Sequence, residues 1–301
     1  MFEAKLIALY SYVAAKYETE LQYHCLRFSN NNEPPAFSDV EVITIYLYAV
    51  RYEELRQVKA MHRFVRNHLL SWFPKLPSYQ AFTNRINRLC SVFGHLAEAI
   101  IEDHLPMDAD PTMSMTDSFP VITCSHKRKP RVALELAVYT YNATKDMWYN
   151  GVKVHISAMH RRSTMPYPYA VLISSANESD LTVFKENDHH HRSTTCFNDK
   201  AYCDRPYAKA LRSNQDVEML TPVKAVKGQS EYVKKRDKAA NDLVSRAVSS
   251  VRQPLESLNN WIHQHSGIQI AGKVRSAKGL LVHVFGRLAA AFASLIIDFN
   301  P

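Results

Sequence analysis

The fold is decided by the stretch Thr112-Met113-Ser114-Met115-Thr116-Asp117-Ser118-Phe119. Side chains alternate along a strand, so positions 113, 115, 117 and 119 share one face, which reads Met, Met, Asp, Phe. The opposite face reads Thr, Ser, Thr, Ser, so Asp117 lies on the side that we expect to be buried. An uncompensated buried charge is costly. Asp117 therefore indicates either a functional carboxylate or a structural one, in an ion pair or at a strand end that reaches solvent.

A second acid, Asp199, ends a short predicted strand that begins at Thr195, and a helical pattern from Pro206 to Leu211 follows it. Ligands collect at the carboxyl ends of strands in α/β sheets, so an Asp there is well placed to hold a metal. Taken by itself, an Asp in such a turn favours a structural role.

A third acid, Glu256, lies on the polar side of the strongest helical pattern in the chain. Arg252 and Asn259 lie on the same surface, since residues three or four apart are neighbours on a helix. Pro254 is expected to kink or restart the helix just before Glu256, because proline has no backbone N–H. For an isolated helix, a solvated face with an Arg–Glu pair explains this pattern. The apolar stripe consists of Val244, Val248, Val251, Leu255, Leu258 and Ile262.

Taken together, the three settings resemble the DDE transposases of bacterial insertion sequences, whose catalytic domain has the RNase H-like fold. Four segments carry the resemblance, and they occur in the family's order. They are Thr116-Asp117-Ser118, Tyr149-Asn150-Gly151-Val152-Lys153-Val154-His155, Asn198-Asp199-Lys200-Ala201-Tyr202 and Arg252-Gln253-Pro254-Leu255-Glu256-Ser257-Leu258.

The resemblance implies that Asp117, Asp199 and Glu256 are catalytic acids that hold two Mg²⁺ or Mn²⁺ ions. Carboxylate oxygens suit these ions, and paired metals are used for phosphodiester chemistry. The implied reaction is DNA cleavage at the ends of an insertion sequence, followed by transfer of the freed 3′-OH into target DNA. Many such transposases carry Tyr, Arg, Glu and Lys around the third acid. Here Ser249 and His263 stand at the Tyr and Lys positions.

The charge of the chain supports a nucleic-acid partner. The 37 Lys and Arg residues exceed the 29 Asp and Glu residues, which gives a net charge of +8. One basic run follows the first acid, and cations elsewhere are expected to contact DNA phosphates. A basic run can also be an ordinary solvated loop. The predicted DNA-binding residues are Lys127, Arg128, Lys129, Arg131, Lys153, Arg252, His263, Arg85 and Arg88.

Residues 1–106 are predicted to be an all-helical N-terminal domain. A capping box from Ser38 to Glu41 opens a helix that runs to about Val50. Two further helices are expected at 54–70 and 78–104. The polar side of the latter, with Arg85 and Arg88, could enter a major groove, or it could equally be the surface of a packing or dimerisation domain. The resemblance favours binding of DNA ends in this part of the chain.

Residues 107–301 are predicted to be an RNase H-like catalytic domain. Strand patterns lie near 113–122, 132–141, 151–159 and 169–176, with a turn at 142–146. A helix near 180–187, the Asp199 strand, a strand near 218–223 and the Glu256 helix follow. The expected fold is therefore α/β, with an RNase H-like mixed sheet flanked by helices and an all-helical domain before it.

Other features exclude several classes of protein. Five Cys residues without a CxxC pair indicate neither a disulfide framework nor a zinc site. The apolar stretch 279–299 contains His283, Arg287 and Asp298, so we expect a buried helix and no membrane span. The start of the chain lacks the pattern of a signal peptide. We expect a cytoplasmic, nucleoid-associated bacterial protein, and the resemblance implies a homodimer on double-stranded DNA.

Two other functions remain open at this stage. A metal-dependent DNA nuclease without strand-transfer activity would use the same three acids. A non-catalytic, transposase-derived DNA-binding protein would need no metal, and it would be expected to have lost an acid. All three acids are present.

Overall fold

The computed structural model describes residues 2–25, 35–125, 132–142, 146–223 and 228–297. The chain forms two compact units, and strands β1 and β3 and helix α8 each continue from one unit into the other. The first unit consists of Met1–His104, Val121–Gly151 and Ile262–Pro301, and the second of Leu105–Pro120 and Val152–Trp261. The first unit thus contains C-terminal residues that the sequence analysis grouped with the catalytic domain.

The N-terminal part of the first unit is helical, as predicted. Its elements are α1 (Phe2–Thr19), η1 (Leu21–His24), α2 (Asp39–Arg51), α3 (Val58–His68), α4 (Tyr79–Arg88) and α5 (Cys90–Asp103). The capping box of α2 is confirmed, because the Ser38 side chain accepts from the backbone N–H of Glu41 and the Glu41 side chain accepts from that of Ser38. The single helix predicted at 78–104 is wrong, since the chain forms two helices that meet at Leu89.

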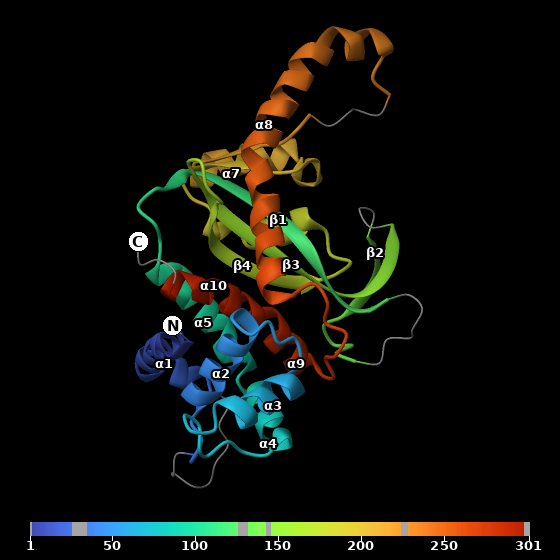
Figure 1. Cartoon of the computed structure of the whole chain (residues 1–301). Helices are drawn as coiled ribbons and strands as arrows, with labels where there is room; N and C mark the ends of the chain where they lie inside the picture. Colours follow the sequence, from blue (N-terminus) through green and yellow to red (C-terminus); the bar gives the residue numbers. More distant parts are fainter. Residues whose placement is uncertain (1, 26–34, 126–131, 143–145, 224–227, 298–301) are drawn as a thin grey trace. The chain divides into compact units, whose positions relative to one another are not determined.

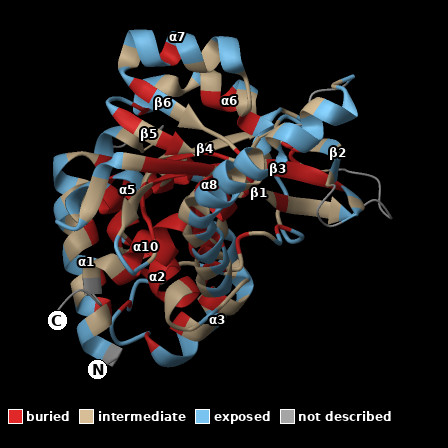
Figure 2. Ribbon diagram, turned by 90° about the horizontal axis from the view of Figure 1, so that it is seen from above, coloured by how far each residue is buried: buried red, intermediate tan, exposed pale blue. Residues whose placement is uncertain are grey.

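The C-terminal helices complete the core of this unit. They are α9 (Ala277–Leu281), the π-helical turn η4 (Val282–Gly286) and α10 (Arg287–Ile297). Helix α10 packs against α1, α2 and α5, and its ribbon is largely buried in Figure 2. The residues 277–296 are long and apolar enough to cross a membrane, but 72% of their most apolar window is buried inside the structure. This burial is typical of a core helix.

The strands form a mixed, six-stranded sheet in the order β2-β3-β1-β5-β6, with β4 paired to β3 (Figure 1). Parallel pairing joins β1 to β5 and β5 to β6, and antiparallel pairing joins β3 to both β2 and β4. This sheet with flanking helices, following a helical N-terminal region, is consistent with the RNase H-like fold that we predicted. The strands are β1 (Ala109–Ser125), β2 (Val138–Asn142), β3 (Met147–Arg161), β4 (Tyr167–Ser175), β5 (Thr194–Phe197) and β6 (Val217–Leu220).

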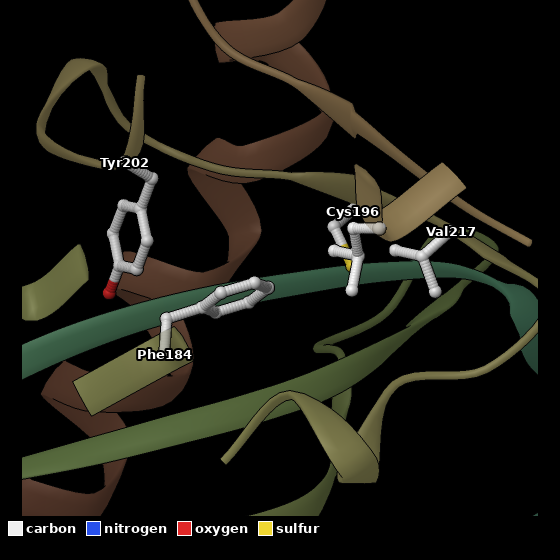
Figure 3. Close-up of a cluster of buried hydrophobic side chains, with 5 residues drawn as sticks. Phe184, Cys196, Tyr202 and Val217 are labelled. Atoms are coloured by element: carbon white, nitrogen blue, oxygen red, sulfur yellow. The ribbon is translucent and has the colours of Figure 1, made fainter. Parts of the chain in front are cut away.

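Helices flank the strands of the second unit. They are α6 (Asp180–Glu186), η2 (Asp188–His190), η3 (Lys200–Tyr202), α7 (Arg205–Gln215) and α8 (Glu231–Ser266). An apolar cluster ties α6, η3 and α7 to β5 and β6. It consists of Leu211 together with Phe184, Cys196, Tyr202 and Val217, which Figure 3 labels. Helix α8 is continuous through Pro254, so the predicted restart before Glu256 is wrong.

Candidate active site

Parallel pairing places Asp117 beside Asp199. The register of β1 and β5 pairs Met113 with Thr195 and Met115 with Phe197. Asp117 and Asp199 each follow two residues further along, so they emerge from neighbouring strands at the carboxyl end of this pair. The backbone N–H of Thr116 donates to Oδ1 of Asn198 at 3.1 Å, which holds the middle of β1 beside the residue that follows β5. The register therefore brings together the first two predicted acids.

Asp117 lies in a poor environment for a charge. Its side chain is 23% exposed, and burial raises its pKa to about 6 against the opposing effect of Arg252. The carboxylates of Asp180 and Asp199 raise this pKa further. Its Oδ2 accepts a hydrogen bond from Nδ2 of Asn259 at 3.2 Å. The ionised form of Asp117 is thus disfavoured even beside Arg252, and a further cation would stabilise it.

Helix α8 brings Arg252, Glu256 and Asn259 to the same place. The Arg252 guanidinium lies 3.6 Å from Oδ2 of Asp117 and donates to Oε1 of Glu256 at 2.7 Å. The Glu256 side chain is 55% exposed. Within the described part of the chain, no three His, Cys, Asp or Glu side chains converge tightly enough to hold a metal ion. Arg252 therefore contacts both the first and the third predicted acid, and the Glu256 carboxylate is bound to its guanidinium.

A fourth acid, Asp180, was not among the predicted site residues. It begins α6 after the Ser179 cap, and its Oδ1 accepts from Ser118 Oγ at 3.0 Å and from Lys153 Nζ at 3.0 Å. Lys153 also donates to the carbonyl of Glu178 at 2.7 Å. The sequence signal was available, since Asp180 follows the end of β4 closely, but an Asp in the first turn of a helix is commonly read as a stabilising charge.

Three polar atoms near these acids are buried without a hydrogen-bond partner in the part of the chain that the structure describes. They are the Tyr202 hydroxyl, Nδ2 of Asn198 and Oδ1 of Asn259. Native structures rarely leave such groups unpaired, and a missing water or ion is one common explanation. The site is therefore lined by carboxylates and by polar atoms that lack partners.

A model of the family described as "Transposase DDE domain" matches residues 109–283, which is more than half of the chain. The chain belongs to this family of DDE transposases. Among curated proteins, none matches it. Membership implies transposase activity and binding of DNA, and transposases of this family generally use divalent metals. The match includes Asp117, Asp180, Asp199 and Glu256.

The other predicted DNA-binding residues of this transposase have different settings. Arg85 pairs with Asp39 and donates to the carbonyl of Phe37, so its side chain is only 18% exposed. Arg88 is exposed at the end of α4. His263 belongs to the first compact unit, whereas the acids belong to the second. Lys127, Arg128, Lys129 and Arg131 lie outside the described residues.

Proposed function

We propose that this transposase cleaves DNA at the ends of an insertion sequence and transfers the freed 3′-OH into target DNA. Asp117, Asp199 and Glu256 are the proposed catalytic and metal-binding acids. The observation that carries the proposal is the β1–β5 register, which sets Asp117 beside Asp199 while Arg252 connects Asp117 to Glu256. Two divalent ions, Mg²⁺ or Mn²⁺, are the proposed cofactors.

The residues fit such ions by their chemistry. All the acids offer carboxylate oxygen, which hard divalent cations prefer, and the unpaired hydroxyl and amides supply further polar contacts. When bound, the ions activate the attacking oxygen and stabilise the leaving 3′ oxygen. Arg252 donates to Glu256 in this structure, and release of Glu256 would let the guanidinium bind the phosphate of the DNA.

The first unit carries a surface suited to DNA ends. Lys59, Arg63 and Arg66 recur at helical spacing on α3, are exposed, and form no ion pair among the described residues. They line a groove with Ser78 and Tyr79, and no Asp or Glu is among its described lining residues. A face of this kind suits the phosphate backbone, so we place DNA-end binding on α3 in preference to Arg85.

A joining assay tests the proposal. Wild type and the variants Asp117→Asn, Asp199→Asn and Glu256→Gln are incubated with Mn²⁺, labelled terminal DNA and a supercoiled target. We expect cleaved ends and joined products from wild type, and a loss of at least about a thousandfold from each variant, because each removes part of the electrostatic stabilisation. Cleavage without joining would favour a nuclease. Normal activity in all three variants would contradict the assignment of the acids.

We also propose that the protein acts as a homodimer on DNA and works at the bacterial nucleoid in the cytoplasm. Both statements rest on family membership. Light scattering with and without terminal DNA tests the first, and a change from monomer to dimer mass on DNA is the expected result.

A further inference from the structure

Asp180 acts electrostatically on Asp117. Ser118 follows Asp117 directly along β1, and its hydroxyl donates to Oδ1 of Asp180 at 3.0 Å. Among the carboxylates that raise the pKa of Asp117, Asp180 has a larger effect than Asp199. The acids that act on Asp117 therefore include one that the DDE pattern does not contain.

Tyr202 supplies an independent observation. Its side chain is 1% exposed, and its hydroxyl has no hydrogen-bond partner among the described residues. Figure 3 shows the tyrosine beside Phe184, with the hydroxyl oxygen at the free end of the ring. Burial raises the pKa of this phenol well above its usual range, and so do Asp180, Asp117 and Asp199, in that order. This buried hydroxyl without a hydrogen-bond partner among the described residues therefore lies within the electrostatic reach of all three carboxylates, and native structures rarely leave such a group unpaired.

We propose that Asp180 is a metal ligand, and that a divalent cation draws its carboxylate together with those of Asp117 and Asp199, which do not converge on a metal site in the described part of this structure. The inference rests on the proposed function and adds a residue to its metal site. The ammonium of Lys153, 3.0 Å from Oδ1, balances the charge of Asp180. Lys153 has a second hydrogen bond, to the carbonyl of Glu178 at 2.7 Å, that does not depend on Asp180. Oδ2 of Asp180 has no hydrogen bond among the described residues and is available to the ion.

The competing explanation is that Asp180 only pairs with Lys153 and holds α6 beside β3. Removal of its charge would then alter metal binding in two indirect ways. The loss of a nearby negative charge weakens attraction of the cation, and salt screens this effect. The freed Lys153 ammonium could also move towards Asp117 and compete with the ion. A test must separate both effects from the loss of a ligand.

The experiment titrates Mn²⁺ into the full chain by calorimetry, without DNA, at 0.05 M and 0.5 M NaCl. The variants are Asp180→Asn, the double variant Asp180→Asn with Lys153→Met, and Asp188→Asn as the matched control. Asp188 accepts from the Tyr207 hydroxyl, and its charge is not among those that act on Asp117. Thermal unfolding without metal shows whether each variant folds.

We expect Asp180→Asn to bind Mn²⁺ at least about tenfold more weakly at both salt concentrations, the double variant to remain equally weak, and Asp188→Asn to bind like wild type. The inference is wrong if the loss disappears at 0.5 M NaCl, if the double variant recovers wild-type affinity, or if Asp180→Asn binds normally. Asp117→Asn and Asp199→Asn are titrated in parallel. If they too bind normally, the proposed function itself fails. If they lose binding and Asp180→Asn does not, only this inference fails.

Discussion

At Asp117, opposing effects act on one carboxylate. Burial raises its pKa, and the Arg252 guanidinium at 3.6 Å lowers it, yet the result is a pKa of about 6. Burial therefore outweighs the ion pair. The pKa in the unfolded chain is about 4, so ionisation of Asp117 opposes folding once the pH rises through this interval. The acid that we place at the centre of the site is thus a source of instability.

This imbalance predicts how Asp117→Asn changes stability with pH. The folded chain binds a proton that the unfolded chain has lost between about pH 4 and 6, so wild type loses stability as the pH rises through that window. Above about pH 6, we expect Asp117→Asn to be more stable than wild type by about 1–3 kcal/mol. At pH 5 we expect a smaller difference in stability between the two. Urea unfolding of the metal-free chain at pH 5 and pH 7.5 measures both values. If the gain in stability at pH 7.5 were equal to or smaller than the gain at pH 5, burial would not be what raises the pKa of Asp117.

The buried hydroxyl of Tyr202 can be removed by the substitution Tyr202→Phe. The change removes a buried hydroxyl that has no partner, so the metal-free chain should become more stable by up to about 1–3 kcal/mol. Mn²⁺ affinity should fall, since the three proposed metal-binding carboxylates all act electrostatically on this hydroxyl. Tyr207→Phe is the control, because its hydroxyl already donates to Asp188 at 2.9 Å. We expect that variant to lose about 1 kcal/mol and to bind Mn²⁺ normally. Thermal unfolding measures the stability of both variants, and calorimetry measures their Mn²⁺ affinity. If Tyr202 were only structural, Tyr202→Phe would lose stability and bind Mn²⁺ normally.

The sequence predicts single residues unevenly. Strand alternation placed Asp117 on an apolar face, and the structure bears this out by its partial burial and by Met115 and Phe119, which are buried on the same face. Alternation cannot report partners distant in the chain. The same limit applies to the polar side of the predicted 78–104 helix, from which we predicted Arg85 as a DNA contact and which does not reveal that Arg85 pairs with Asp39. Asp180 was missed because its first-turn position explains an acid without any site.

At the level of elements, α8 is a helix that tolerates an internal proline. Pro254 lacks the N–H that would bond to the carbonyl of residue 250, and such a proline usually breaks a helix. The helix nevertheless runs unbroken from Glu231 to Ser266, and Val248, Leu255, Leu258 and Ile262 are buried along one side. Packing of this side outweighs the local penalty. The periodic apolar stripe therefore predicted the helix better than the proline predicted its interruption.

Pro254→Ala should stabilise the second unit. It restores one backbone hydrogen bond and removes the ring clash, for a gain of up to about 3 kcal/mol. Glu256 lies two residues further on, so we expect any straightening of the helix to alter the Arg252–Glu256 pair and to reduce DNA cleavage. Guanidinium unfolding and the cleavage assay measure the two effects, with Gln253→Ala as the control. A less stable variant would mean that the helix depends on the proline.

Helices α4 and α5 are separated at a position where the sequence predicts a continuous helix. The pattern from 78 to 104 contains no proline, and Gly94 is its only glycine, so nothing local predicts a break. The chain nevertheless turns at Leu89, which has φ −88° and ψ 15°, and Phe82, Ile86, Val92 and Leu96 are buried on either side of it. Tertiary packing overrides propensity here. The existence of helical structure was predictable, but its division into two helices was not.

On the scale of the whole molecule, the sequence predicted the order of the elements, but it does not reveal how distant stretches of the chain pack together. The α/β order and the mixed sheet are confirmed. The first compact unit, however, draws on three separate stretches of chain, and its core includes α10 beside α2 and α5. Ala289, Ala290, Ala291 and Ala293 are fully buried. The apolar pattern of α10 predicts that the helix will be buried, but it does not predict which helices will pack against it.

Net charge leads to the last prediction. The chain carries +8, but only cations without acidic partners should release counterions from DNA. Lys59, Arg63 and Arg66 on α3 have no such partners among the described residues, whereas Lys234, Arg236 and Lys238 on α8 pair with Glu231, Asp237 and Asp242. Replacing the α3 set by Ala should therefore reduce the slope of log K against log salt by about 2–3. The same replacement of the α8 set should change it by less than about 1. Fluorescence anisotropy with labelled terminal DNA measures both slopes, and equal effects of the two triple variants would show that total charge governs binding and that α3 holds no special position.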